Sequence, residues 1–122
     1  MSNRPGRIGV LMQAATGLNR EGWWQPAADV CRTRTGWLLK FELAGVKPED
    51  MAVETAGSRI KVSGVRRDWV VEEAESYHSM EISYNRFERA LELPCCLDGA
   101  RLEMECRDGI LLVRVTPEGE KP

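Results

Sequence analysis

One histidine and four cysteines are the side chains of this 122-residue chain best suited to acid/base, metal or redox chemistry. His78 stands alone, so acid/base pairs of histidines and histidine-rich metal sites cannot form within the chain. Cys95 and Cys96 are adjacent, with no intervening residue that would let both thiolates wrap one ion, and Cys31 and Cys106 are far apart in the sequence. The residue types therefore predict no enzyme, no metal site and no cofactor.

The wider composition excludes further classes of function. The cysteines lack the spacing of a disulfide framework, which favours reduced thiols in a cytoplasmic protein. Lys and Arg total 17 against 19 Asp and Glu, so the chain lacks the basic excess of a nucleic-acid-binding protein. No apolar run reaches the roughly 18 residues of a membrane span. We expect no nucleic-acid partner and no membrane span.

From Trp23 onward the apolar residues alternate with polar ones, which is typical of half-buried β-strands. Strands are predicted over the following ranges: 37–43, 51–55, 60–62, 87–93, 102–106 and 111–115. Turn residues separate them, and Asp108-Gly109 predicts a hairpin because both residues tolerate positive φ. Short strands at this spacing, with no convincing helix between them, predict an all-β antiparallel sandwich.

Two segments depart from this alternation. Residues 1–22 contain four glycines and three arginines and predict a flexible N-terminal arm, with a short helix over 10–15. The segment 65–84 is long for a loop of a compact sandwich, and residues 68–84 contain five acids and no Lys or Arg. Residues 77–84 alternate again, which predicts a strand carried on the loop. Such an exposed strand needs a partner, and a second subunit would supply one.

Four motifs occur in an order and spacing that resemble the α-crystallin domain of bacterial small heat shock proteins. They are residues 42–50 (ELAGVKPED), 60–66 (IKVSGVR), 87–94 (FERALELP) and 108–113 (DGILLV). Each is weak alone, whereas the four together are specific. The resemblance covers residues 23–116, leaving residues 117–122 as a short C-terminal tail.

The resemblance implies a fold, an assembly and an activity. The fold is an immunoglobulin-like antiparallel β-sandwich with a long loop, and the assembly is a homodimer, possible also as a small oligomer. The dimer forms by exchange of the strand in that loop, here Tyr77, His78, Ser79, Met80, Glu81 and Ile82. The implied activity is an ATP-independent chaperone, a holdase of the stress response that binds partly unfolded client proteins in the cytoplasm and suppresses their aggregation. The sequence agrees, since it contains no nucleotide-binding loop.

The resemblance also suggests which surfaces bind clients. A groove for a client or a tail is implied at Met51, Val53, Leu102 and Met104. Methionine adapts to irregular apolar partners, so Met104, where the family usually has alanine, suits promiscuous binding, although a plain core role is equally expected. Further apolar contacts are expected from the arm, at Ile8, Val10, Leu11 and Met12. The tail lacks the family's Ile-x-Ile/Val motif, so we expect a dimer rather than a large assembly.

Two alternatives to the holdase stay open. One is a related interaction module that no longer holds clients and serves one dedicated partner. The other is a redox switch built on Cys95 and Cys96, although no Lys, Arg or His is adjacent in the sequence to favour a thiolate.

Overall fold

A computed structural model describes the backbone of residues 9–11 and all of residues 23–119. The elements in chain order are β1 (Gly9–Leu11), β2 (Ala28–Arg32), β3 (Trp37–Glu42), the 3₁₀ turn η1 (Pro48–Asp50), β4 (Met51–Ala56), β5 (Arg59–Arg66), the 3₁₀ turn η2 (Val71–Glu73), β6 (Asn85–Glu92), β7 (Arg101–Arg107) and β8 (Ile110–Thr116).

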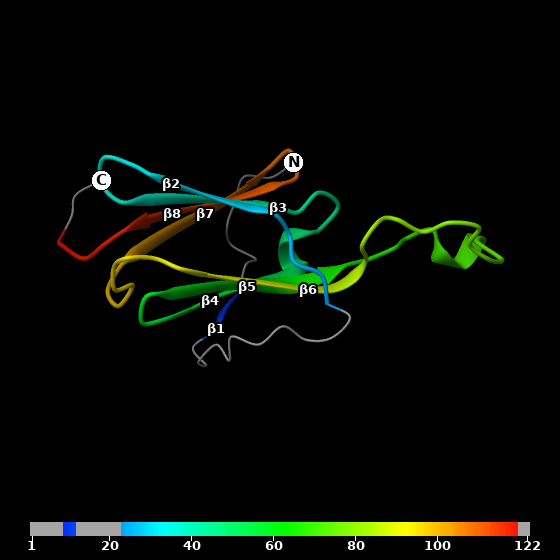
Figure 1. Ribbon diagram of the computed structural model, residues 1–122, viewed down its shortest axis with the longest axis horizontal. Helices are drawn as coiled ribbons and strands as arrows, with labels where there is room; N and C mark the ends of the chain where they lie inside the picture. Colours follow the sequence, from blue (N-terminus) through cyan, green and yellow to red (C-terminus); the bar gives the residue numbers. More distant parts are fainter. Residues whose placement is uncertain (1–8, 12–22, 120–122) are drawn as a thin grey trace.

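The strands form two sheets that pack face to face, as the two layers of Figure 1 show. One sheet has the order β1-β4-β5-β6 and the other has the order β2-β3-β8-β7. All strand pairs are antiparallel except β1–β4, which is parallel. The predicted all-β sandwich is confirmed.

The core lies between the sheets and consists of the alternate residues that the sequence pattern marks. In the β3–β8 pair, Leu39 lies opposite Val113 and Phe41 opposite Leu111, so one face of both strands is apolar. The largest buried side chains of the other sheet are Phe87, Ile60, Val53 and Val62. Burial of each such side chain contributes about 1.5–3 kcal/mol, which makes this interface the main source of stability.

The predicted hairpin at Asp108-Gly109 is also confirmed. It joins β7 to β8, and both residues have positive φ, 52° for Asp108 and 82° for Gly109. This is the conformation that a two-residue turn requires to match the twist of the strands it connects.

The structure differs from the sequence-based expectation at the edges of the sheets. Ala28–Arg32 forms the edge strand β2, although its alternation is poor because most of its side chains are exposed. The predicted helix over 10–15 is wrong at Val10 and Leu11, which belong to strand β1, and residues 12–15 lie outside the described residues. The flexibility of the arm stays a prediction.

Candidate functional site

The four predicted groove residues lie on strands that meet at one side of the sandwich. β7 is the last strand of its sheet, and Cys106 on β7 places its Sγ 4.0 Å from Sδ of Met51 on β4. Met51 and Val53 are buried in the core, whereas Leu102 and Met104 are half-buried and pack against it. All four therefore belong to the core cluster or pack against it, only the β7 pair keeps accessible apolar surface, and the groove itself stays a prediction.

The backbone of β1 covers the edge of β4, the strand that carries Met51 and Val53. Gly9 lies opposite Ala52, Val10 opposite Val53, and Leu11 opposite Glu54. Two predicted arm contacts, at positions 10 and 11, therefore lie next to the predicted groove. The other two, Ile8 and Met12, lie outside the described residues.

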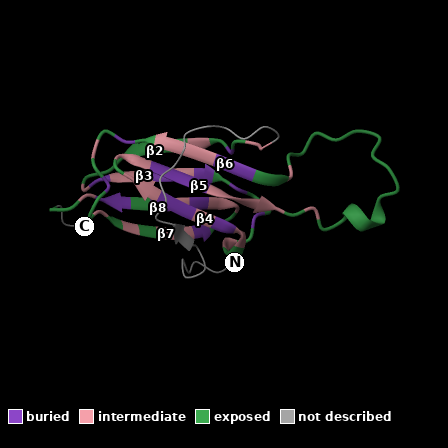
Figure 2. Cartoon of the chain, turned by 90° about the horizontal axis from the view of Figure 1, so that it is seen from below, coloured by how far each residue is buried: buried purple, intermediate pink, exposed green. Residues whose placement is uncertain are grey.

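The predicted exchange segment, residues 77–82, lies in the long loop between β5 and β6. The loop projects away from the sandwich, and Figure 2 shows it exposed along almost its whole length. Its exposed apolar side chains are Trp69, Val70, Val71, Tyr77, Met80 and Ile82, with Trp69 87% exposed. Within the described part of this single chain the segment pairs with no strand, so the exchange strand stays a prediction.

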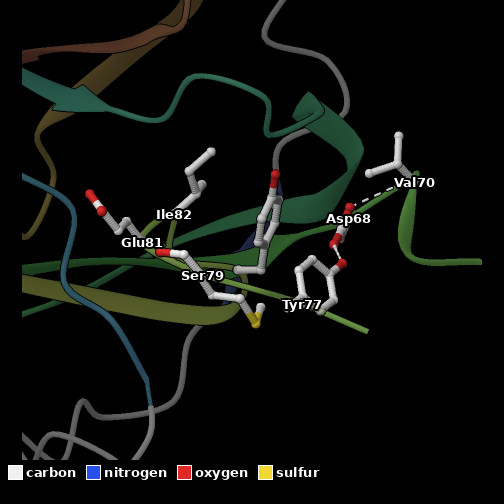
Figure 3. A pocket seen from close by; sticks show the side chains of 8 residues that line it. Asp68, Val70, Tyr77, Ser79, Glu81 and Ile82 are labelled. Carbon is white, nitrogen blue, oxygen red and sulfur yellow. Dashed lines mark hydrogen bonds between the residues drawn. The ribbon is translucent and has the colours of Figure 1, made fainter. Parts of the chain in front are cut away.

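Hydrogen bonds to Asp68 organise the loop internally. The Tyr77 hydroxyl donates to Oδ2 of Asp68 at 2.7 Å, and the backbone N–H of Val70 donates to Oδ1 at 3.2 Å. The bond to Asp68 raises the pKa of the Tyr77 hydroxyl, because the carboxylate stabilises its protonated form. Figure 3 shows these groups around a cavity of about 140 Å³, lined also by Met80, Ile82 and other loop residues.

Arg66 fixes the base of the loop to the sandwich. Its guanidinium donates to the backbone oxygen of Ser83, through Nε at 2.9 Å and Nη2 at 2.6 Å. A further bond, from Nη1 to the oxygen of Ala44, measures 2.9 Å. The same group lies 4.2 Å above the Trp24 ring and 5.7 Å from the Tyr84 ring. One planar cation therefore joins both strands of the loop base to the end of β3.

The next residue, Arg67, makes a second attachment. Its Nε and Nη2 donate to the two carboxylate oxygens of Asp50 at 2.9 and 3.0 Å. This hydrogen bonding, supported by the positive charge, lowers the pKa of Asp50 below its ordinary value. The start of the loop is thereby tied to η1.

Three charged side chains are buried on the other sheet face, the one turned away from the core. Lys61 on β5 places its Nζ 3.1 Å from a Glu54 oxygen and 3.3 Å from a Glu88 oxygen. The second Glu54 oxygen, Oε2, has no hydrogen-bond partner among the described residues. The cluster therefore carries two carboxylates for one ammonium group.

The cysteines occupy three kinds of environment, and all four are free. Cys106 is buried, and desolvation raises the pKa of its thiol. Cys95 is half-buried, whereas Cys31 and Cys96 are exposed. The backbone N–H of Asp98 donates to Sγ of Cys96 at 3.4 Å.

Metal binding and a membrane span were the remaining expectations about the described residues. Among residues 9–11 and 23–119, no group of three or more His, Cys, Asp or Glu side chains is arranged to hold a metal ion. In the same part of the chain, no helix is long and apolar enough to cross a membrane.

Comparison with known families decides the relationship. The model of the Hsp20/alpha crystallin family matches residues 29–122, which include all strands from β3 to β8. The chain belongs to this family.

Curated proteins from bacteria, plants and Dictyostelium discoideum are similar to this chain. Spore protein SP21 of Stigmatella aurantiaca is 33% identical over 104 residues, which are 84% of this chain and 62% of that protein. Small heat shock protein C2 of Rickettsia felis is 24% identical over 90 residues, which are 74% of this chain and 58% of that protein. The chain thus spans less than two thirds of the length of these curated relatives.

Solved small heat shock protein structures have the same sandwich. HSP18.5 from E. histolytica is 25% identical and superposes with a TM-score of 0.63, covering 77% of this chain and 88% of that one. Heat shock protein 16.0 from Schizosaccharomyces pombe has a TM-score of 0.74 at 23% identity, covering 87% and 78% of the two chains. The second likeness concerns the fold alone.

Sequence reasoning missed three features of this Hsp20-family chain: β1 on the edge of β4, the Arg66 attachment and the buried charges. Lys61, Glu54 and Glu88 lie on three neighbouring strands, on the face turned away from the core. Their opposite charges predict an ion-pair cluster only once the register of these strands is known. Arg66 carries no signal of its own, because its partners are mainly backbone oxygens distant in sequence.

Proposed function

We propose that this chain is an ATP-independent holdase that binds partly unfolded proteins and suppresses their aggregation in the cytoplasm. Family membership supports the proposal. The observation that carries it is the exposed apolar surface of the loop outside the exchanged segment, where Trp69, Val70 and Val71 are exposed to solvent close to acidic side chains. Apolar groups that face solvent bind other apolar segments, while the surrounding charges keep the complex dispersed.

The energetics suit holding rather than tight binding. A client segment that covers ~400 Å² of apolar surface gains on the order of 10 kcal/mol at about 25 cal/mol per Å². Association and ordering costs of similar size offset most of that gain, so each contact is weak and reversible. Binding to the unfolded form shifts the client's equilibrium by mass action and needs no nucleotide.

A second binding surface is proposed at the groove between β4 and β7. Leu102 and Met104 offer half-buried apolar side chains there, and the flexible thioether of Met104 adapts to different partners. The edge of β7 has no neighbouring strand among the described residues, so an extended client segment could add to it.

The proposed assembly is a homodimer in which each copy places residues 77–82 on its partner. In the single chain this segment is exposed and pairs with no strand of the described residues, although its alternation of apolar and polar residues is typical of a strand. Exchange would bury Met80 and Ile82, which are exposed in the isolated chain.

The test of holding is light scattering from a heat-labile model enzyme, with the chain added and nucleotide absent. Near-stoichiometric suppression is expected. A variant with Trp69→Ser and Val71→Ser should suppress less, because it removes apolar surface, whereas Glu49→Ser and Glu118→Ser, both exposed, should not matter. Absence of any suppression by the unaltered chain would favour the dedicated-partner module.

A further inference from the structure

The turn between β2 and β3 is basic. Residues 30–40 contain Arg32, Arg34 and Lys40 and no acid. Lys40 already pairs with Asp29 at 3.4 Å. Arg32 lies 5.0 Å above the Trp37 ring, and exposed Arg34 makes no ion pair with any residue of the described chain. Two arginines at the end of an edge strand are therefore available to a partner.

The tip of the long loop is acidic. Glu72, Glu73 and Glu75 lie within four residues of one another, and all are exposed. None of the three forms an ion pair inside the part of the chain that the structure describes. Like charges this close repel one another, so an incoming pair of cations would relieve that repulsion.

The acidic tip and the basic turn of one chain cannot meet. The loop base and the basic turn lie at opposite ends of β3. Arg66 holds the loop base against Ala44, just after the C-terminal end of β3, whereas the basic turn comes just before Trp37, where β3 begins. Seven residues of extended chain separate the two ends by about 23 Å, and screening removes most attraction beyond ~10 Å. Figure 1 shows the loop projecting from the end of the sandwich opposite to that turn.

A second copy of the chain can supply the basic turn that the acidic tip cannot reach within its own chain. β2 has one neighbour, β3, so its other edge is free among the described residues. Each copy thus carries one acidic loop and one basic turn beside an open edge. In a two-fold symmetric dimer, the acidic loop of each copy pairs with the basic turn of the other, so no acidic loop and no basic turn is left unpaired.

We propose that Glu72, Glu73 and Glu75 of one copy lie against Arg32 and Arg34 of the other, and that this charge pairing selects the partner for loop exchange. The inference rests on the proposed homodimer and adds the groups that recognise the partner. The acids lie on the N-terminal side of residues 77–82, whereas Arg32 and Arg34 lie at the C-terminal end of β2. Because these two ends are paired, the exchanged segment runs antiparallel to the partner's β2.

Charge pairs at the rim of an interface act mainly on the association rate and on specificity. The dimer should therefore form more slowly and dissociate more readily as salt is raised from low to physiological concentration. A related chain with a basic loop or an acidic turn would be rejected, because like charges would then face each other.

The test is a charge exchange between two variants. One carries Arg32→Glu and Arg34→Glu, and the other carries Glu72→Arg and Glu73→Arg. Alone, each places like charges together and should dimerise about tenfold or more weakly than the unaltered chain. Mixed, they restore opposite charges at both contacts, so the heterodimer should approach the unaltered affinity in sedimentation velocity.

A matched control and a second readout make the outcome decisive. Lys47→Glu and Arg101→Glu change the net charge by the same amount as the double arginine variant. Both positions are exposed and lie outside the turn, Arg101 on the opposite edge strand β7, so the control should leave dimerisation unchanged. Circular dichroism checks that every variant folds. A monomeric unaltered chain, unaffected single variants or a mixture that fails to associate would each overturn the proposal. Light scattering on the same samples reports holding separately, so loss of holding alone would count only against the holdase.

Discussion

Lys61 shows at the scale of single residues how this sheet tolerates buried charge. Its ammonium group stands between Glu54 and Glu88, and the side chains are only 7%, 3% and 9% exposed. Two short ion pairs offset part of the cost of removing three charges from water. The contacts span β4, β5 and β6, so one lysine links three strands on the face opposite the core.

Replacing Lys61 by methionine should destabilise the fold by about 3–5 kcal/mol, because it leaves two carboxylates buried without a counter-charge. Urea unfolding followed by circular dichroism measures this loss. The control is Lys40→Met, which breaks the Lys40–Asp29 pair, where the side chains are 43% and 69% exposed. That change should cost less than about 1 kcal/mol. An equal loss of unfolding free energy in the two variants would show that burial does not make the Lys61 ion pairs more important to stability than an exposed pair.

Among the elements, the junction of η1 with β5 depends on close backbone approach. A Cβ on Gly64 would collide with the backbone oxygen of Asp50 and lie 2.9 Å from Cζ of Phe87. The glycine thus lets η1 pack directly on β5, next to the point where Arg67 binds Asp50. The base of the long loop is positioned by this contact.

Gly64→Ala should therefore destabilise the sandwich by about 1–3 kcal/mol, the usual cost of overpacking a close contact. Gly57→Ala is the comparison, since Gly57 has open space around it and a φ of +61°, so only the backbone conformation is strained. Its loss of stability should be about 1 kcal/mol, the lower end of the cost of placing an L-residue in the left-handed region. Thermal unfolding of both variants measures the difference, and a Gly64 variant as stable as the unaltered chain would contradict the close contact.

The sequence predicted the central strands because each has one face in the core and one in solvent. Leu39 and Phe41 alternate with Leu38 and Lys40 for this reason, and their strand is confirmed. The edge strand β2 has no such contrast, since four of its five residues are exposed. The edge strand and the Arg66 attachment depend on hydrogen bonds to the backbone of segments distant in the sequence. Such bonds produce no periodic pattern of apolar residues.

In the whole molecule, β1 of the N-terminal arm lies next to the predicted groove, although the sequence suggested the two as separate binding surfaces. β1 adds a fourth strand to its sheet by pairing with β4, so the backbone of the arm covers an edge that would otherwise be open. Only three residues take part, and a parallel pair is slightly less stable per residue than an antiparallel one. The pairing should therefore open well before the sandwich unfolds.

Amide hydrogen exchange at Ala52–Glu54 should report this pairing, since these residues lie opposite β1. Deleting residues 1–11 removes β1, so the amides of this stretch that face it should exchange about tenfold or more faster. Deleting residues 1–7 shortens the arm but keeps Gly9–Leu11, so exchange there should remain as in the full chain. Identical exchange in both deletions and the full chain would mean that β1 does not cover β4 in solution. Faster exchange confined to the longer deletion would assign the edge of β4 to the chain's own arm.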